Sequence, residues 1–400
     1  MTNVADTWGI NPQQFWLRGQ RPEEPVRFDP ETGMWNVYGY PETVRVLGDP
    51  ATFSSDTLRV LPDSVMRGNK QMREGNLVQM DEPDHKKLRR LVSEAFTPKV
   101  VADLEPRIAA LTHELLDAAA QRGRLELVAD LAYPLPVIVI AELLGVPSSD
   151  RDLFKQWVDK MLEYSGQFSL VKQSAEQDRA IEIVFEQRRQ LTEYLAAHAT
   201  ERSQRPREDL LTKLVQAEVD GERLTTNEVV NFATVLLIAG HITTTMLLGN
   251  TVLCLDAHRE QMARVRADRR RLPGAIEESL RFLSPFAAVG RATTVETELG
   301  GARIPADKLL MVWIAAANRD ERQFARPDEY DPTRDPNPHV AFGRGIHFCL
   351  GAPLARLEGR VALGILLDRF PELRVAPEGP EFIPSPNMTG VRKLPLLLAP

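Results

Sequence analysis

A cysteine stands between a glycine-rich turn and a predicted helix in the last fifth of this 400-residue chain. Cys349 follows Gly343 and Gly345, which permit a tight turn, and Gly351 leaves room for close approach to the sulfur. Helical spacing resumes at residues 352–370. A thiolate at a helix N-terminus lies near the positive end of the macrodipole, which favours the ionised form and tunes a bound metal. Taken alone, the pattern fits either a metal ligand or a buried, incidental thiol.

Two pairs of polar residues have helical spacing. Glu278 and Arg281 lie three apart, and an ordinary pair of this kind is a surface ion pair contributing roughly 0.3 kcal/mol. His85 and Arg89 lie four apart and share a helical face. Each pair is weak as an isolated motif, because solvated charges and packed histidines are common.

Residues 342–351 resemble the haem-binding loop of the cytochrome P-450 family, Phe-Gly-x-Gly-x-His-x-Cys-x-Gly, at every fixed position. Three later residues match the usual continuation, namely Ala355, Arg356 and Glu358. The resemblance extends from Asp84 to the tail and implies the P-450 fold, mainly α with a minor β part, as one large haem-binding domain over residues 1–400. It implies haem b with the Cys349 thiolate as axial ligand, which pushes electron density to iron and favours O–O cleavage.

The resemblance assigns further contacts to the cofactor. Haem propionates need cationic or hydrogen-bonding partners when they leave bulk water. The residues matching the family's propionate contacts are His85, Arg89, Arg291 and His347. The loop itself contributes Phe342, Gly343 and Gly351. The family's E-x-x-R pair is matched by Glu278 and Arg281, with Arg334 as the expected third member of a structural network, whereas Cys254 is expected to be a packed core thiol.

The oxygen-binding segment of the family's central helix, usually Ala/Gly-Gly-x-Asp/Glu-Thr, is matched by Ala239, Gly240 and Thr243. Ile242 stands where the carboxylate is expected, which removes one member of a proton relay from a dry site. Three routes remain open for the protons: water together with Thr243, His241, or a polar group of the substrate. His241 faces another side of the helix and is expected to be packed.

The resemblance implies a monooxygenase that inserts one atom of O2 into an apolar or amphipathic organic compound, in secondary metabolism. We find no GxGxxG after a strand and no cysteine cluster, so electrons are expected from a separate ferredoxin and ferredoxin reductase, or a flavodoxin. The missing acid keeps a peroxide-driven peroxygenase or another non-hydroxylating haem-thiolate reaction open. A non-enzymatic haem sensor predicts no substrate cavity, which the long loop and the apolar helix argue against.

The family resemblance also implies a docking surface for the electron donor and a pocket for the substrate. A positive face for an acidic electron donor is expected around the cysteine, although ordinary surface charge explains it nearly as well. Its members are Lys86, Lys87, Arg90, Arg344 and Arg356. The predicted substrate-lining residues are Leu61, Val65, Met66, Val78, Phe168, Leu236, Ala239, Phe286, Ala288, Val289 and Met388.

The composition agrees with a globular protein, at 43% hydrophobic and 26% charged residues. A formal net charge of −7 argues against general nucleic-acid binding, and only two cysteines favour a reducing cytoplasm. No signal peptide or anchor is visible at the N-terminus. We therefore expect a cytoplasmic monomer that binds neither nucleic acid nor membrane.

Predicted elements position these residues. Residues 85–280 have mostly helical spacing, including a central helix at about 226–256. Its stretch 229–255 carries no charge and is expected to be buried inside protein rather than in a membrane. A short strand and helix are predicted around residues 34–48, and a hairpin around Gly300 and Gly301. Residues 324–341 carry four prolines and predict an ordered coil that leads into the cysteine loop.

Overall fold

The computed structural model describes residues 4–61, 74–93, 97–120, 124–164, 170–171, 175–219 and 221–398. Helices dominate these ranges and the sheets are small, as predicted. The α-helices are α1 Val4–Thr7, α2 Tyr40–Gly48, α4 Asp84–Ser93, α5 Pro98–Asp103, α6 Glu105–Ala120, α7 Pro134–Leu144, α8 Arg151–Glu163, α9 Ala175–Gln204, α10 Leu210–Gln216, α11 Thr226–Ala257, α12 Arg259–Ala267, α13 Leu272–Phe282, α14 Ile314–Ala317 and α15 Ala352–Arg369. The strands are β1 Val26–Asp29, β2 Met34–Val37, β3 Phe53–Ser54, β4 Leu125–Glu126, β5 Glu218–Val219, β6 Glu222–Arg223, β7 Val289–Thr293, β8 Thr297–Leu299, β9 Ala302–Ile304, β10 Leu309–Val312, β11 Arg374–Val375, β12 Glu381–Phe382, β13 Val391–Lys393 and β14 Pro395–Leu397.

Helix α11 is the central element and ends within one residue of its predicted boundary. It begins with a capping box, in which Thr225 Oγ1 accepts the Glu228 N–H at 3.2 Å and Glu228 Oε2 accepts the Thr225 N–H at 2.8 Å. The helix is long and apolar enough to cross a membrane, but 67% of its apolar window is buried by protein. It packs against α7, α9, α13 and α15, so the lack of charge over residues 229–255 reflects a place in the core, as predicted.

The largest sheet has the strand order β1-β2-β10-β7-β3. Strand β2 runs parallel to β10, and every other neighbouring pair is antiparallel. Strand β7 places Arg291 opposite Leu310 of β10. The predicted hairpin is formed by β8 and β9, where Gly300 and Gly301 have φ values of 56° and 81° that favour glycine at both positions of the turn.

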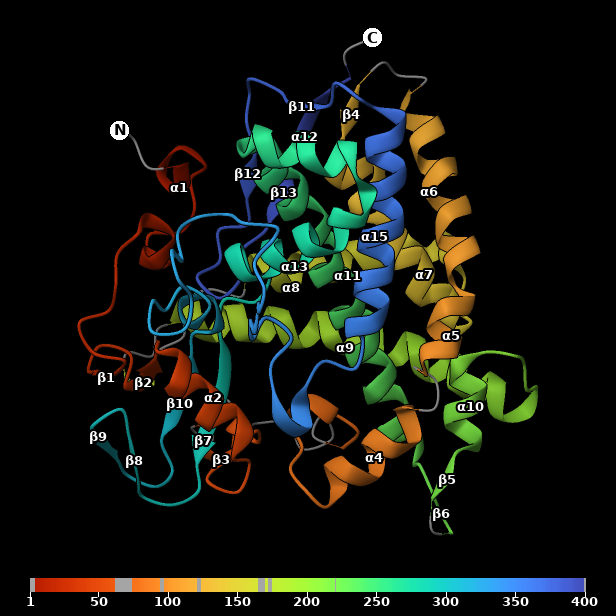
Figure 1. Cartoon of the computed structure of the whole chain (residues 1–400). Helices are drawn as coiled ribbons and strands as arrows, with labels where there is room; N and C mark the ends of the chain where they lie inside the picture. The colour runs from red at the N-terminus through yellow and green to blue at the C-terminus, as the bar shows by residue number, and fades with distance from the viewer. Residues whose placement is uncertain are drawn as a thin grey trace.

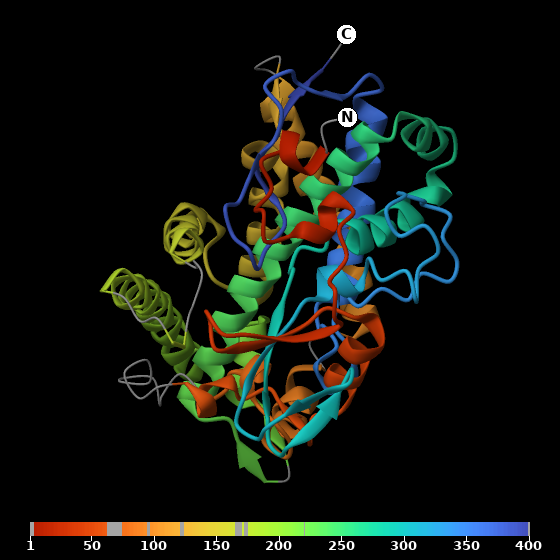
Figure 2. The same cartoon turned by 90° about the vertical axis from the view of Figure 1, so that its left-hand side faces the viewer.

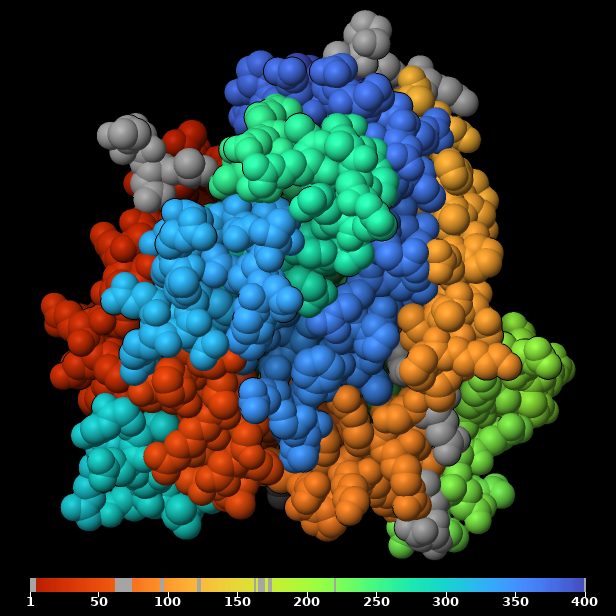
Figure 3. Space-filling model, in the orientation of Figure 1, coloured from red at the N-terminus to blue at the C-terminus, as the bar shows by residue number. Residues whose placement is uncertain are grey.

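The helices form a thick layer beside this sheet. Helices α6 and α15 run side by side, and the loop that leads into α15 descends between α2 and α4 (Figure 1). Helices α8 and α9 lie on the other side of α11 from the sheet (Figure 2). The space-filling view shows the blue loop segment reaching the surface between α2 and α4 (Figure 3). The cysteine loop therefore joins the helical layer to the sheet.

One buried amide links the N-terminal segment to the tail. Gln14 Nε2 donates to the carbonyl oxygens of Ser385, Pro386 and Met388 at 3.3, 3.2 and 3.0 Å. Thr389 Oγ1 donates to Gln14 Oε1 at 2.7 Å. The same turn pairs with the segment after α13, where the Ala287 N–H donates to Asn387 at 2.8 Å and the Thr389 N–H to Pro285 at 2.9 Å. Gln14 thus fixes the turn that carries the predicted lining residue Met388.

Candidate active site

The cysteine loop has the predicted geometry. Gly343 and Gly345 have φ values of 70° and 71°, and a β-carbon at Gly345 would lie 2.6 Å from the carbonyl oxygen of Leu47. The Cys349 N–H donates to the carbonyl oxygen of Phe342 at 2.9 Å, which closes the loop. A β-carbon at Gly351 would lie 4.0 Å from Cys349 Sγ, an ordinary contact distance. The turn therefore requires glycine at positions 343 and 345, whereas position 351 lies close to the sulfur without requiring it.

The surroundings of Cys349 oppose and favour a thiolate at the same time. Burial raises the pKa of the thiol, whereas the backbone N–H groups of Gly351 and Ala352 and the charges of Arg89 and Arg356 lower it. Each of these groups stabilises a negative sulfur. A cation bound to the sulfur would add to them and offset the burial, as expected of a ligand to iron.

Four cationic or proton-donating side chains gather beside the loop. His85 and Arg89 come from α4, Arg291 from β7, and His347 from the 3-10 helix η9 at Gly345–His347. The rings of His85 and His347 lie 4.3 Å apart, and Arg89 Nη2 donates to the carbonyl oxygen of Phe348 at 2.7 Å. The structure thus brings together all four residues predicted to contact propionates.

These four side chains form no ion pair within the described ranges, although the charge of Asp81 acts on His85, Arg291 and His347. The Nε2 atoms of His85 and His347 have no hydrogen-bond partner there. Burial lowers the pKa of Arg291 to about 10, and burial with the charges of Arg291 and His85 lowers that of His347 to about 3. Two histidine nitrogens without hydrogen-bond partners, beside two guanidinium groups without ion pairs, fit an anionic ligand, so the set fits the two propionates of haem.

The Glu278–Arg281 pair is buried rather than on the surface. Both side chains are fully buried, and the guanidinium of Arg281 donates two hydrogen bonds to Glu278, at 2.8 and 2.9 Å. Arg334 Nε donates to Glu278 at 3.3 Å, so the predicted third member does join them. Asn337 and the Asp331 N–H also donate to Glu278, at 3.1 and 2.9 Å. The network holds the coil that precedes the cysteine loop.

Sequence reasoning missed a second carboxylate beside this network. Glu277 accepts two hydrogen bonds from Arg356, at 2.6 and 2.8 Å, and lies 3.0 Å from His339 Nε2. The sequence signal for Glu277 was its position directly before Glu278. Two residues of the expected positive face are therefore ion-paired: Arg356 with Glu277 and Lys87 with Glu222.

One face of α11 is open although the rest of the helix is buried. Ala239 is exposed and Leu236, Gly240 and Thr243 are partly exposed, at spacings of three and four residues. An exposed alanine in the middle of a core helix indicates a hollow beside it. Thr243 Oγ1 lies on this face and donates to the carbonyl oxygen of Ala239 at 2.8 Å.

Ile242 and His241 face other directions. Ile242 is buried in an apolar cluster with Val158 of α8 and Met246 of α11, against which Met388 also packs. His241 is fully buried, its Nδ1 lies 2.8 Å from the Leu237 carbonyl oxygen, and its ring packs edge-on against Tyr133. Burial lowers the pKa of His241 to about 4, so it is neutral at pH 7. The expectation that His241 is packed is confirmed.

The predicted lining residues divide into three groups. Val65, Met66 and Phe168 lie outside the described residues. Phe286 and Met388 form a β-bridge, and with Leu61, Leu236, Ala239 and Val289 they are partly or well exposed. Ala288 is buried, and Val78 is 57% exposed, more than expected for a residue inside a pocket. Cys254 is fully buried, as expected of a core thiol.

The family model for cytochrome P-450 matches residues 13–398. The chain belongs to the cytochrome P-450 family. The cyclomarin C epoxidase CymV of Salinispora arenicola is 43% identical over 379 residues, covering 95% of this P-450 and 94% of the relative. Among solved structures, HmtT, involved in himastatin biosynthesis, is 59% identical with a TM-score of 0.88. The post-tailoring hydroxylase HmtN, also involved in himastatin biosynthesis, is 56% identical with a TM-score of 0.86; both matches cover 100% of each chain.

These similarities establish the general activity. This P-450 is an enzyme, a haem-thiolate monooxygenase whose relatives are named as hydroxylases and as an epoxidase. Enzymes of the family use haem iron with a cysteine thiolate ligand. The predictions of family, fold and oxygen insertion are confirmed.

Proposed function

We propose that Cys349 is the thiolate ligand of haem b and that this P-450 oxidises an apolar or amphipathic compound of secondary metabolism. One observation carries the ligand assignment: the sulfur meets the N–H groups of Gly351 and Ala352 and lies near Arg89, which forms no ion pair in the described ranges. The names of relatives that act on cyclomarin C or in himastatin biosynthesis support the substrate class. Bound haem supplies the activation of O2, from which one oxygen atom enters a C–H or C=C bond.

Each side chain of the site then has a role. The propionates are held by His85, Arg89, Arg291 and His347. The loop around the sulfur is shaped by Phe342, Gly343 and Gly351. Ala239 and Gly240 leave space beside α11. The Glu278, Arg281 and Arg334 network fixes the coil before the loop.

Proton supply on the open face of α11 depends on Thr243. Its hydroxyl can release the carbonyl oxygen of Ala239 and hold a proton near the substrate. Ile242 offers no proton, and His241 is neutral and packed against Tyr133. A water molecule or a polar group of the substrate therefore has to deliver protons to Thr243 Oγ1.

Ile242 also supports a second candidate, a peroxide-driven reaction. Hydrogen peroxide supplies both the oxygen atom and the protons, so this reaction does not depend on an acidic side chain in the site. Product formed from peroxide without any electron donor, at a rate above that of the donor-driven reaction, would favour this candidate.

Electrons come from a separate protein, for which we propose a ferredoxin with its reductase, or a flavodoxin. Lys86, Arg90 and Arg344 are exposed on α4 and on the cysteine loop, and Phe348 between them is 41% exposed. A rim of positive charge around an apolar residue suits an acidic carrier. We further propose that the protein is a cytoplasmic monomer.

The reduced holoprotein with carbon monoxide tests the central assignment. We expect a strongly red-shifted Soret band that Cys349→Ala abolishes and Cys254→Ala leaves in place. Incubation with a surrogate ferredoxin, its reductase and isotopically labelled O2 should then place one labelled atom in an apolar substrate. A band unaffected by Cys349→Ala would overturn the ligand assignment, and unlabelled product would overturn O2 as the oxygen source.

A further inference from the structure

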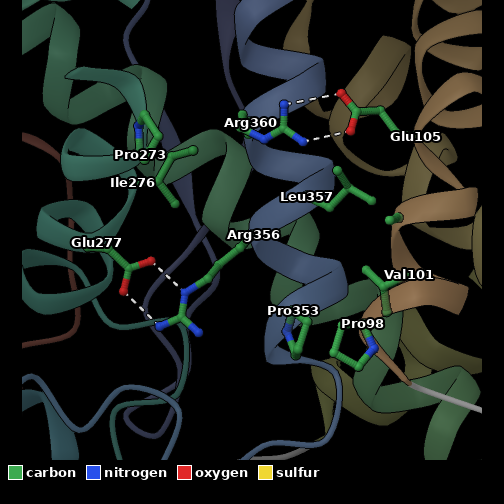
Figure 4. A pocket seen from close by; sticks show the side chains of 11 residues that line it. Pro98, Val101, Glu105, Pro273, Ile276, Glu277, Pro353, Arg356, Leu357 and Arg360 are labelled. Carbon is green, nitrogen blue, oxygen red and sulfur yellow. Dashed lines mark hydrogen bonds and ion pairs between the residues drawn. The ribbon is translucent and has the colours of Figure 1, made fainter. Parts of the chain in front are cut away.

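The carboxylate of Glu277 connects the two chain segments that flank the cysteine loop. His339 lies before the loop and Arg356 follows it on α15, and both contact Glu277 of α13. The view in Figure 4 shows Glu277 and Arg356 extending toward each other from neighbouring helices, with both hydrogen bonds between them. A single side chain thus fixes the position of both ends of the loop.

The contact to His339 has a defined proton arrangement. The Ala341 N–H donates to His339 Nδ1 at 3.3 Å, so Nε2 carries the ring proton and donates to Glu277. His339 is almost fully buried. Although burial opposes ionisation, the hydrogen bonds from Arg356 and His339 hold the pKa of Glu277 at about 2, so the carboxylate is charged at neutral pH.

Arg356 passes this constraint to the loop. Its guanidinium lies over the Phe342 ring, 4.6 Å from the centroid, and the carbonyl oxygen of Phe342 accepts the Cys349 N–H. The bidentate pair with Glu277 fixes the plane of the guanidinium, because two parallel hydrogen bonds leave it little freedom to rotate. The path from Glu277 to Cys349 therefore contains three contacts, through Arg356 and Phe342.

On the assumption that Cys349 binds haem, we propose that Glu277 is a positioning residue for the thiolate: it holds His339 and Arg356 so that the loop keeps Cys349 in place as a ligand. Glu278 has a different task, because its partners lie on the coil at residues 331–337. Helix α13 thus presents two adjacent carboxylates, one for the coil and one for the loop.

The chain offers a matched control. Glu105 of α6 accepts two hydrogen bonds from Arg360, at 3.1 and 2.8 Å, one turn further along α15. Both pairs border the same surface pocket of about 380 Å³ (Figure 4). Arg360 has no contact with the loop among the described residues, so Glu105→Gln removes an equivalent pair without touching the path to Cys349.

The test compares wild type, Glu277→Gln, Glu277→Ala and Glu105→Gln as holoproteins. The readouts are the rate at which the reduced carbon monoxide complex loses its thiolate Soret band during mild heating, the haem reduction potential, and the global unfolding midpoint. We expect about tenfold faster band loss in both Glu277 variants, the effect of removing one charge-assisted interaction. We also expect a higher reduction potential, because Arg356 loses its counter-charge near the sulfur. Glu105→Gln should behave as wild type.

Two outcomes are clearly distinguishable. Band loss that follows global unfolding equally in the Glu277 and Glu105 variants, with unchanged potentials, would overturn the positioning role while leaving Cys349 as the ligand. A wild-type complex without the thiolate band would overturn the proposed function itself. Rescue is expected from Glu277→Asp with a potential closer to wild type than that of Glu277→Gln, since the counter-charge is retained.

Discussion

At the scale of single residues, the packing of Ile242 determines what an engineered acid would do there. The side chain is buried among apolar groups from α8, α11 and the tail, none of which can hydrogen-bond to a carboxylate. We expect Ile242→Glu to lower the free energy of unfolding by about 3 kcal/mol at pH 8. Burial raises the pKa of such a carboxyl, so the loss should shrink toward about pH 5, where the group is protonated in the folded protein. Urea unfolding at the two pH values measures both effects.

Ile242→Val is the control, because it removes one methylene and should lower stability by about 1 kcal/mol at either pH. The amount of product formed per NAD(P)H consumed tests proton supply independently of stability. If the folded Ile242→Glu variant forms no more product per NAD(P)H than Ile242→Val, then residue 242 does not limit proton delivery during oxygen activation. That result would support delivery of the proton by the substrate.

Glu358 makes stability depend on pH. Burial raises its pKa from 4.5 to about 8, and its Oε2 atom has no hydrogen-bond partner in the described part of the chain. The folded carboxyl stays protonated while the unfolded one ionises, so stability is lost as pH rises from about 4.5 to about 8 and is flat above that range. Glu358→Gln should therefore gain on wild type by roughly 5 kcal/mol across this interval. Chemical unfolding as a function of pH measures it, with Glu163→Gln at an exposed position as a surface control.

The residues that bear chemistry were largely predictable because they lie in short, contiguous motifs. Cys349 and His347 share one loop, and Thr243 follows a recognisable helix segment. Glu277 and His339 were missed because they are 62 positions apart and are joined only by the fold. Burial was also hidden: the spacing of Glu278 and Arg281 is the same for a surface pair and for the fully buried pair observed.

At the scale of elements, the start of α11 depends on its capping box. Thr225 is exposed and its hydroxyl accepts the N–H of Glu228. Thr225→Ala should destabilise the protein by about 1 kcal/mol, because an N–H in the first turn loses its acceptor. The adjacent Thr226 is equally exposed and makes no capping bond, so Thr226→Ala should change stability by less than about 0.5 kcal/mol. Equal midpoints for the two variants in urea unfolding would contradict this view of the cap.

The element boundaries followed from local signals where such signals exist. Thr225 and Glu228 mark the start of α11, and the Gly300–Gly301 pair marks the β8–β9 turn. The sequence contains no comparable signal for strand pairing. Strand β2 lies beside β10 although more than 270 residues separate them. The alternation of side chains along a strand does not identify its partner strand.

At the scale of the whole molecule, the proposed electron donor should respond to charge on one face only. We expect the double variant Lys86→Glu, Arg344→Glu to lower kcat/KM for the ferredoxin about tenfold at low ionic strength, with a smaller effect as salt is added. Lys160→Glu on α8, on the other side of α11, should have no such effect. Turnover measured against ferredoxin concentration at several salt concentrations tests this. The double variant changes the net charge by −4 and Lys160→Glu changes it by −2. A loss in Lys160→Glu of about half the size on a logarithmic scale would therefore point to net charge rather than a docking face.

The amide of Gln14 has a consequence for the order of folding. Its hydrogen-bond partners at residues 385–389 lie 371 to 375 positions away along the chain, and Met388 of the same turn packs against the apolar cluster around Ile242. Contacts between such distant segments form slowly, because a large loop has to close before they can stabilise anything. Helix α11 can therefore form from local contacts first, whereas the turn beside its open face is expected to be among the last parts of the molecule to settle.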